Sequence, residues 1–140
     1  MIYVDTSALV PLFIREPTSD AVIDWIESSG DRLAISEWTL VEFASAAAIK
    51  LRTGQASPNL VKQAKARMYK FAQKHCTIAV PGREDFRRAA ELVGVDTLKL
   101  RAGDALHLAI AESLNTQGIL CLDQAMIESA KLLGMTTVAI

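Results

Sequence analysis

Several kinds of residue and segment are scarce in this sequence, and each shortage excludes a class of protein. The two cysteines, Cys76 and Cys121, form neither a disulfide framework nor a closely spaced metal-binding pair, so we expect free thiols in a reducing, cytoplasmic setting. No apolar run approaches the roughly 18 residues that span a membrane. The N-terminus lacks a basic segment followed by an apolar one, so we expect neither a secretion signal nor a removable leader.

The residues that are present have the composition of an ordinary globular protein. Hydrophobic residues make up 51% of the chain and charged residues 22%. A length of 140 residues suits one domain around a single core, and no repeat, low-complexity tract or linker divides the chain. We therefore expect residues 1–140 to form one domain.

Charge is spread unevenly along the chain, although the net charge is only −1. Residues 1–49 carry two basic and eight acidic side chains, residues 50–88 carry ten basic and two acidic ones, and residues 89–140 carry three and six. A basic middle segment is typical of a surface that meets a polyanion or an acidic partner. It is equally typical of a solvated helical hairpin, and charge alone leaves both interpretations open.

Short apolar strands alternate with helices in the predicted secondary structure. Short runs rich in β-branched or apolar residues predict strands at 2–4, 33–35, 77–80, 119–122 and 136–139. Helical spacing of apolar residues predicts helices at 8–14, 18–30, 37–51, 58–75, 84–93, 102–115 and 124–133. Apolar strands joined by helices indicate an α/β fold, a three-layer α/β/α sandwich with a central parallel sheet of about five strands.

Four acidic residues do not fit the water-facing sides of the predicted helices. Asp5 ends the first strand and Asp123 follows the fourth. Asp104 opens an apolar helix, and Glu42 lies inside a helical turn between two apolar neighbours. The carboxyl ends of parallel strands share one edge with the helix N-termini that follow them. We therefore expect the four carboxylates to meet at that edge.

Each of these acids also has a purely structural explanation. Asp123 could cap the last helix, Asp104 could complement a helix dipole, and Glu42 could point to solvent. Asp5 is the hardest to explain in this way, because a strand-end carboxylate in apolar surroundings loses its hydration. Four independent coincidences are a weaker explanation than one shared site.

A cation would resolve the repulsion among four clustered carboxylates, several of which would otherwise be driven to protonate. Oxygen ligands without a His or Cys partner suit Mg²⁺ or Mn²⁺ better than zinc. A carboxylate-held Mg²⁺ commonly acts on phosphate esters, where it activates water and neutralises charge. The residues themselves thus predict a metal-dependent phosphoryl hydrolase.

Four segments of the chain resemble the acidic motifs of PIN-domain ribonucleases, and most closely those of VapC-type toxins from bacterial and archaeal toxin–antitoxin pairs. They are Val-Asp-Thr-Ser-Ala-Leu (4–9), Leu-Val-Glu-Phe-Ala-Ser-Ala (40–46), Gly-Asp-Ala-Leu-His-Leu-Ala (103–109) and Leu-Asp (122–123), of which the first and third are the most specific. The resemblance spans essentially the whole chain. It implies an α/β/α fold, Mg²⁺- or Mn²⁺-dependent cleavage of single-stranded or looped RNA, a homodimer, and inhibition by a small antitoxin protein.

The resemblance also implies roles for the four acids. Asp5 and Asp104 match the principal metal ligands of the family. Glu42 matches a third acid that binds metal directly or through water, and Asp123 matches a fourth that supports the site or a second metal. The implied reaction is in-line attack on phosphorus by metal-activated water, which leaves a 5′-phosphate and a 3′-hydroxyl.

The same resemblance implies supporting roles for some residues next to the acids, and we give the others a structural role. Thr6 and Ser7 match hydroxyls that support the metal site. Many relatives have Thr or Ser two residues before the fourth acid, where this chain has Cys121, a poorer hydrogen-bond donor. His107 lies three residues after Asp104, and we interpret it as a core histidine satisfied by a neighbour rather than as a functional residue.

Basic residues are candidates for contact with RNA or with a protein partner. Arg101, three residues before Asp104, either contacts a substrate phosphate or pairs with a surface acid. Lys62, Lys65 and Lys70 lie on the predicted basic helix. RNA, a dimer mate and an antitoxin remain alternative partners for them.

Two other classes of function compete with the nuclease. One is a catalytically silent PIN-like module that binds RNA or protein. The other is a Mg²⁺-dependent phosphatase or a receiver-like domain. An aspartyl-phosphate phosphatase has a second Asp two residues after the first, where this chain has Ser7. A receiver requires a Lys after a late strand, whereas the first Lys after the predicted strand at 119–122 is Lys131, inside a predicted helix.

Overall fold

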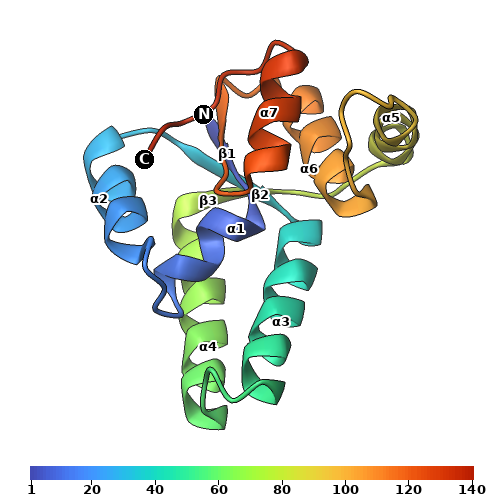
Figure 1. The fold of residues 1–140 in the computed structure, drawn as a ribbon. Coiled ribbons are helices and arrows are strands. Elements are labelled where there is room, and N and C mark those ends of the chain that lie inside the picture. Colours follow the sequence, from blue (N-terminus) through green and yellow to red (C-terminus); the bar gives the residue numbers. More distant parts are fainter.

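A four-stranded parallel sheet forms the centre of the computed structural model, which describes residues 1–140 (Figure 1). The strands are β1 (Ile2–Val4), β2 (Leu33–Ser36), β3 (Cys76–Ala79) and β4 (Gly118–Leu120). Their spatial order is β3-β2-β1-β4, with every neighbouring pair parallel. The residues of β1, β2 and β4 are buried, as a sheet covered on both faces requires, whereas the edge strand β3 is only partly buried.

Helices cover both faces of this sheet. They are α1 (Thr6–Leu9), which continues into the 3-10 turn η1 (Val10–Leu12), and α2 (Ser19–Ser29), α3 (Glu37–Arg52), α4 (Pro58–His75), α5 (Arg83–Val93), α6 (Ala102–Ser113) and α7 (Gln124–Leu132). One core cluster joins Val4 and Ile35 to α1 through α4, with Phe43 and Met68 among its members. A second joins Tyr3 and the other face of the sheet to α5, α6 and α7. The three-layer α/β/α sandwich predicted from the sequence is therefore confirmed.

Helix starts follow the capping signals of the sequence. Ser36 Oγ accepts a hydrogen bond from Thr39 N at 3.2 Å, and Thr39 Oγ1 accepts one from Ser36 N at 3.1 Å, which closes a capping box at the start of α3. Ser57 Oγ accepts from Leu60 N at 3.1 Å, and Pro58 occupies the first turn of α4. Helices α3 and α4 then lie side by side and project away from the sheet (Figure 1).

The predicted fifth strand is reduced to one isolated bridge, between Ile119 and Thr137. Ile119 N donates to Thr136 O, and Val138 N donates to Ile119 O, both at 2.9 Å. Beyond Leu120 the chain leaves β4 and turns towards α7, so the C-terminal segment pairs with β4 only at this one position. The sheet accordingly has four strands rather than about five, and the fourth ends two residues earlier than predicted.

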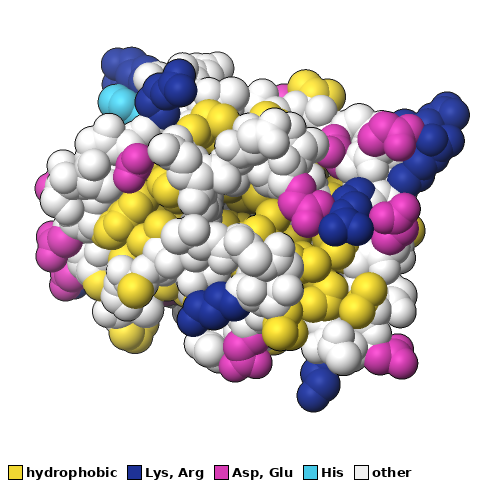
Figure 2. Space-filling view, turned by 90° about the horizontal axis from the view of Figure 1, so that it is seen from above, with side chains coloured by type: hydrophobic (Ala, Val, Ile, Leu, Met, Phe, Trp, Pro, Cys, Tyr) yellow, Lys and Arg dark blue, Asp and Glu magenta, His cyan; other side chains and the backbone are white.

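The molecular surface mixes apolar and charged side chains. Seen from above, hydrophobic side chains show through across the middle of the face, and charged side chains lie mostly towards its rim (Figure 2). No helix combines the length and the apolar character that crossing a membrane would require.

Candidate active site

Asp5 stands where β1 ends, next to the carboxyl end of β4. Its carboxylate is buried and caps α1, with Oδ2 accepting hydrogen bonds from Ser7 N at 3.0 Å and Ser7 Oγ at 2.5 Å. Ser7 Oγ in turn accepts from Leu122 N at 2.8 Å, which ties the end of β1 to the segment after β4. Both bonds from Ser7 go to Oδ2, so Oδ1 is turned away from α1, towards His107 Nε2 at 3.3 Å.

Glu42 reaches the same place from α3. Its Oε2 accepts a hydrogen bond from Thr6 Oγ1 at 2.7 Å and lies 2.6 Å from His107 Nε2. Helix α6 approaches very closely here, because a Cβ on Gly103 would lie only 2.7 Å from Glu42 Oε1. The glycine in the third motif therefore allows the α6 backbone to come against the Glu42 carboxylate.

The side chains of Asp5, Glu42 and His107 stabilise one another's charged forms. Burial alone would raise the pKa of Glu42, but the hydrogen bonds from His107 and Thr6 outweigh it and hold that pKa below its usual range. Burial alone would lower the pKa of His107, but the bond to Glu42 and the charge of Asp5 outweigh it and raise that pKa. An imidazole that favours its charged form thus lies between two carboxylates.

Asp104 and Asp123 lie beside this group and share one arginine. Asp104 Oδ2 is 3.3 Å from Arg101 Nε, and Asp123 Oδ2 is 3.5 Å from Arg101 Nη2. Asp123 also caps α7, since its Oδ1 accepts from Met126 N at 2.9 Å. Burial, together with the nearby charges of Asp123 and Asp5, raises the pKa of Asp104 in spite of Arg101.

The four predicted acids are therefore brought to one edge, but in two unequal sets. Ligand atoms of Asp5, Glu42 and His107 all lie within 4.8 Å of one another. Asp104 and Asp123 are outside this group of three and are linked through Arg101. Asp5 Oδ2 accepts from Ser7 and Glu42 Oε2 accepts from Thr6, whereas Asp5 Oδ1 has only the longer 3.3 Å contact to His107 Nε2 and Glu42 Oε1 lies outside these bonds. Such half-engaged carboxylates suit a hard divalent cation.

His107 is a member of the site for which the sequence suggested only a core role. It is fully buried and satisfied by neighbours, as expected, but one of those neighbours is Glu42. Its spacing of three residues from Asp104 was the one signal available, because that spacing puts both side chains on adjoining parts of α6. Cys121, the departure from the family pattern, is buried, with Sγ 3.5 Å from Asp5 Oδ2 and 3.7 Å from the backbone oxygen of Asp123.

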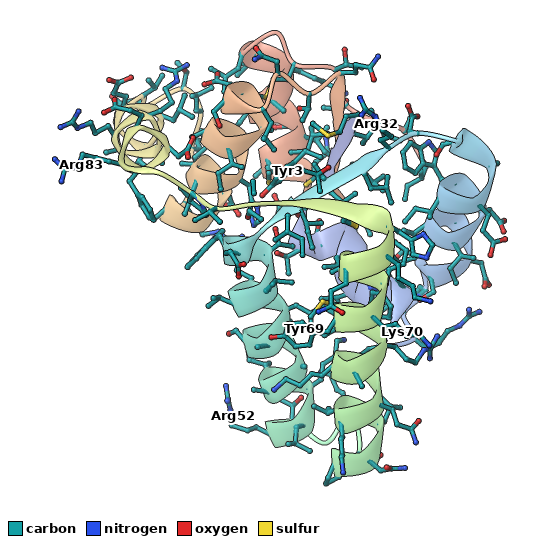
Figure 3. The ribbon with its side chains drawn as sticks, turned by 180° about the vertical axis from the view of Figure 1, so that it is seen from behind. Tyr3, Arg32, Arg52, Tyr69, Lys70 and Arg83 are labelled. Atoms are coloured by element: carbon teal, nitrogen blue, oxygen red, sulfur yellow. The ribbon has the colours of Figure 1, made fainter.

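A polar groove of about 460 Å³ runs beside the acids and is lined in part by Thr6, Ser7 and Asp123. Lys50, at another part of its wall, pairs with Glu16 at 2.6 Å. The predicted contact residues Lys62, Lys65 and Lys70 lie on α4, which contains no acidic residue, and none of them forms an ion pair. Figure 3 shows Lys70 and Tyr69 on this projecting helix.

Comparisons with known proteins find similarity over nearly the whole chain. The family model described as "PIN domain" matches residues 2–132. The chain is 29% identical over 140 residues to ribonuclease VapC46 of Mycobacterium tuberculosis, an alignment that covers 99% of this chain and 96% of that protein.

Solved structures with the same fold include two from toxin–antitoxin work. Mycobacterium tuberculosis VapC20, described as a sarcin-ricin loop cleaving toxin, superposes with a TM-score of 0.77 at 18% identity and 100% coverage of both chains. A chain of a toxin–antitoxin complex from Klebsiella pneumoniae gives a TM-score of 0.69 at 19% identity, covering 99% of this chain and 97% of that one. At these sequence identities the superpositions show similarity of fold alone.

Proposed function

The chain belongs to the PIN-domain family, and from this premise we propose that it is a metal-dependent endoribonuclease acting as the toxin of a toxin–antitoxin pair. The observation that carries the proposal is the convergence of Asp5, Glu42, Asp104 and Asp123 at one edge of a parallel sheet. Similarity over nearly the whole chain to a protein named as a ribonuclease supports the same activity.

The proposed cofactor is Mg²⁺ or Mn²⁺. Asp5 and Asp104 would be its principal ligands, with Glu42 as the third acid and Asp123 as the fourth. When bound, the cation supplies an activated water and neutralises charge on the phosphate. Ser7 engages Asp5 Oδ2 and Thr6 engages Glu42 Oε2, which leaves Glu42 Oε1 and Asp5 Oδ1, the latter 3.3 Å from His107 Nε2, to face the cation.

The proposed substrate is single-stranded or looped RNA. The groove is lined by Asp123 and by Thr6 and Ser7, which bond to the other acids, and Arg101, which is paired with Asp104 and Asp123, can pass from these carboxylates to a substrate phosphate. Unpaired lysines on α4, namely Lys62, Lys65 and Lys70, supply further phosphate contacts. A cytoplasmic enzyme is part of the proposal, since such RNA is found there.

The proposed protein partners are a small cognate antitoxin and a second copy of the chain. A relative of the same fold was solved in a toxin–antitoxin complex. The homodimer is supported by exposed apolar side chains on α5, where Phe86 is 56% and Val93 is 45% exposed beside an apolar pocket lined by Trp38 and Leu106. Exposed apolar patches of this kind are typical of protein interfaces.

Removal and return of the cation tests the proposal. Protein stripped with EDTA should leave a structured RNA intact, and Mg²⁺ or Mn²⁺ should restore endonucleolytic cleavage. The matched control is Asp5→Asn, which keeps the size of the side chain and should stay inactive after metal is returned. Binding of RNA without cleavage, in the presence of either metal, would instead identify a catalytically silent RNA-binding module.

A further inference from the structure

A chain of buried hydrogen bonds leads from the sheet to the acids. Tyr3 OH lies 2.8 Å from His107 Nδ1, and His107 Nε2 lies 2.6 Å from Glu42 Oε2. Both Tyr3 and His107 are 0% exposed. Figure 3 shows Tyr3 in the interior of the molecule, beside the strands.

Tyr3 is itself fixed from a second direction. Its hydroxyl lies 2.9 Å from Ser36 Oγ and 3.4 Å from Thr39 Oγ1, the two residues that close the capping box of α3. Helix α3 carries Glu42, and β1 carries Tyr3 and ends at Val4, directly before Asp5. The hydrogen-bonded chain therefore connects the elements that deliver Asp5, Glu42 and, through α6, Asp104.

The imidazole of His107 is held at both of its nitrogens, so its ring cannot rotate without losing a buried hydrogen bond. Nε2 faces a carboxylate and hence acts as the donor in that pair. This bond makes Nε2 a donor to Glu42 rather than a free nitrogen for a metal. Nδ1 lies 2.8 Å from the Tyr3 hydroxyl, which holds the other side of the ring.

Two apolar side chains of similar size would fill this interior space without any need for polar partners. Burying a hydroxyl and an imidazole is costly unless each is hydrogen-bonded. Here each polar atom is bonded, and the chain of bonds ends on the carboxylate of a residue in the acidic site.

We propose that Tyr3 and His107 are positioning residues that hold Glu42, and with it Asp5, in the arrangement that binds the cation. The inference deepens the proposed function and rests on it, since it takes these carboxylates as cation ligands. A glutamate side chain loses conformational freedom when it binds a metal, and a donor at Oε2 removes that freedom in advance. His107 Nε2 also lies 3.3 Å from Asp5 Oδ1, so the same N–H group faces both carboxylates and offsets part of their mutual repulsion.

The test uses three variants of the full chain and one control. His107→Asn keeps a polar atom near the position of Nδ1 and loses the contact to Glu42. His107→Gln keeps a donor near the position of Nε2 and loses the contact to Tyr3. Tyr3→Phe removes only the hydroxyl. The control is Ser129→Ala, which also removes one buried hydroxyl, from a bond of 2.5 Å to Leu98 O remote from the acids.

Binding of Mn²⁺ is followed by the loss of the free-ion electron paramagnetic resonance signal, with thermal unfolding of the metal-free proteins measured in parallel. His107→Asn should weaken Mn²⁺ binding about 10- to 100-fold, as expected when a residue that orients a metal ligand is removed. Tyr3→Phe should weaken Mn²⁺ binding about 3- to 10-fold, which corresponds to the net contribution of one hydrogen bond. His107→Gln should retain more affinity than His107→Asn. Saturating Mn²⁺ should restore most of kcat in Tyr3→Phe without a change in the KM for RNA.

A purely structural role predicts a different pattern. Tyr3→Phe and Ser129→Ala would then both lower the unfolding temperature, while Mn²⁺ affinity stayed within twofold of wild type in both, and this result would overturn the inference. Equal affinities for His107→Gln and His107→Asn would also contradict it. If wild type bound Mn²⁺ and the variants lost it in the predicted order, but no protein cleaved RNA, the inference would stand and the proposed nuclease would fail.

Discussion

The acidic edge has an inner half and an outer half that are neutralised in different ways. The inner half, Asp5 and Glu42, is bridged by His107, which is 0% exposed and lies 2.6 Å from Glu42 Oε2 and 3.3 Å from Asp5 Oδ1. The outer half, Asp104 and Asp123, is bridged by Arg101, whose side chain is 79% exposed and no closer than 3.3 Å.

Because of this difference, Asp5 and Glu42 are preorganised, whereas the contacts of Arg101 can rearrange. The buried imidazole is held at both ends and has no second position within reach, so the inner carboxylates keep one geometry. An exposed arginine at such distances contributes little to stability, because water and salt screen it. Arg101 can therefore leave its two partners when a cation or a phosphate competes for the same place.

Removing charge from the inner half should have the largest effect. Asp5→Asn keeps an oxygen for Ser7 N but removes one charge from the cation site. The loss of several kcal/mol of transition-state stabilisation should lower the cleavage rate by about a thousandfold or more. Folding should be unchanged or slightly more stable, since repulsion between carboxylates is relieved. Single-turnover cleavage and thermal unfolding measure the two effects.

Asp104→Asn, made in parallel, compares the two halves directly. Asp104 is a principal ligand in the proposed site, so Asp104→Asn should also abolish cleavage, although Asp104 belongs to the outer half. Wild-type cleavage by either variant would show that the assignment of the ligands is wrong.

The close approach of α6 to α3 supplies the second prediction. In Gly103→Ala the new methyl group would meet Glu42 Oε1, so the end of the flexible glutamate side chain must move. Cleavage should fall about 10- to 100-fold, comparable to loss of a supporting contact in a metal site, while the fold remains intact. Gly82→Ala is the control, because its nearest neighbour, Asp85 Oδ2, is at an ordinary 3.7 Å. Equal activity of Gly103→Ala and wild type would show that the position of Glu42 is unimportant.

Arg101→Ala tests the rearrangement proposed for the outer half and should have a smaller effect. Loss of the competing guanidinium should lower the Mn²⁺ concentration needed for half-maximal cleavage, while the KM for RNA should rise. Each change should be about two- to fivefold, because an exposed ion pair is worth roughly 1 kcal/mol or less. A higher Mn²⁺ requirement would mean that Arg101 supports the acids rather than competing for them.

The smallest effect on the reaction itself should come from the lysines of α4 that form no ion pair. Replacing Lys62, Lys65 and Lys70 by Gln together should weaken RNA binding and leave kcat unchanged. If all three contact phosphates of single-stranded RNA, the slope of log affinity against log salt concentration should fall by about 2. Lys131→Gln, an exposed charge on α7, is the control. An unchanged slope would assign these lysines to a protein partner or to solvent.

The starts of α3 and α4 and the edge positions of two acids were predictable because local signals specify them. Asp5 and Asp123 could be recognised as edge residues from the apolar runs that precede them, and Ser36 and Ser57 as helix caps from their own side-chain chemistry. The fifth strand could not be excluded in this way, because its length depends on where β4 turns away.

Contacts between helices were not predictable from such local signals. The bond between His107 and Glu42 depends on how α6 is rotated against α3, which is set by packing across the whole domain. The sequence pattern put all four acids at one edge, but it could not show that Arg101 would bridge two of them and His107 the other two. The donor that each carboxylate acquires is a property of the folded chain.

The chemistry of the RNA ends tests the central claim most directly. Fragments produced by the wild-type protein in Mg²⁺ should carry a 5′-phosphate and a 3′-hydroxyl, as mass spectrometry can establish, and should be absent with EDTA or with Asp5→Asn. A water held at the acidic edge that attacks phosphorus and displaces the 3′-oxygen would leave those ends. Fragments ending in a 2′,3′-cyclic phosphate and formed equally well in EDTA would contradict the account, because they would require attack by the RNA's own hydroxyl without a cation.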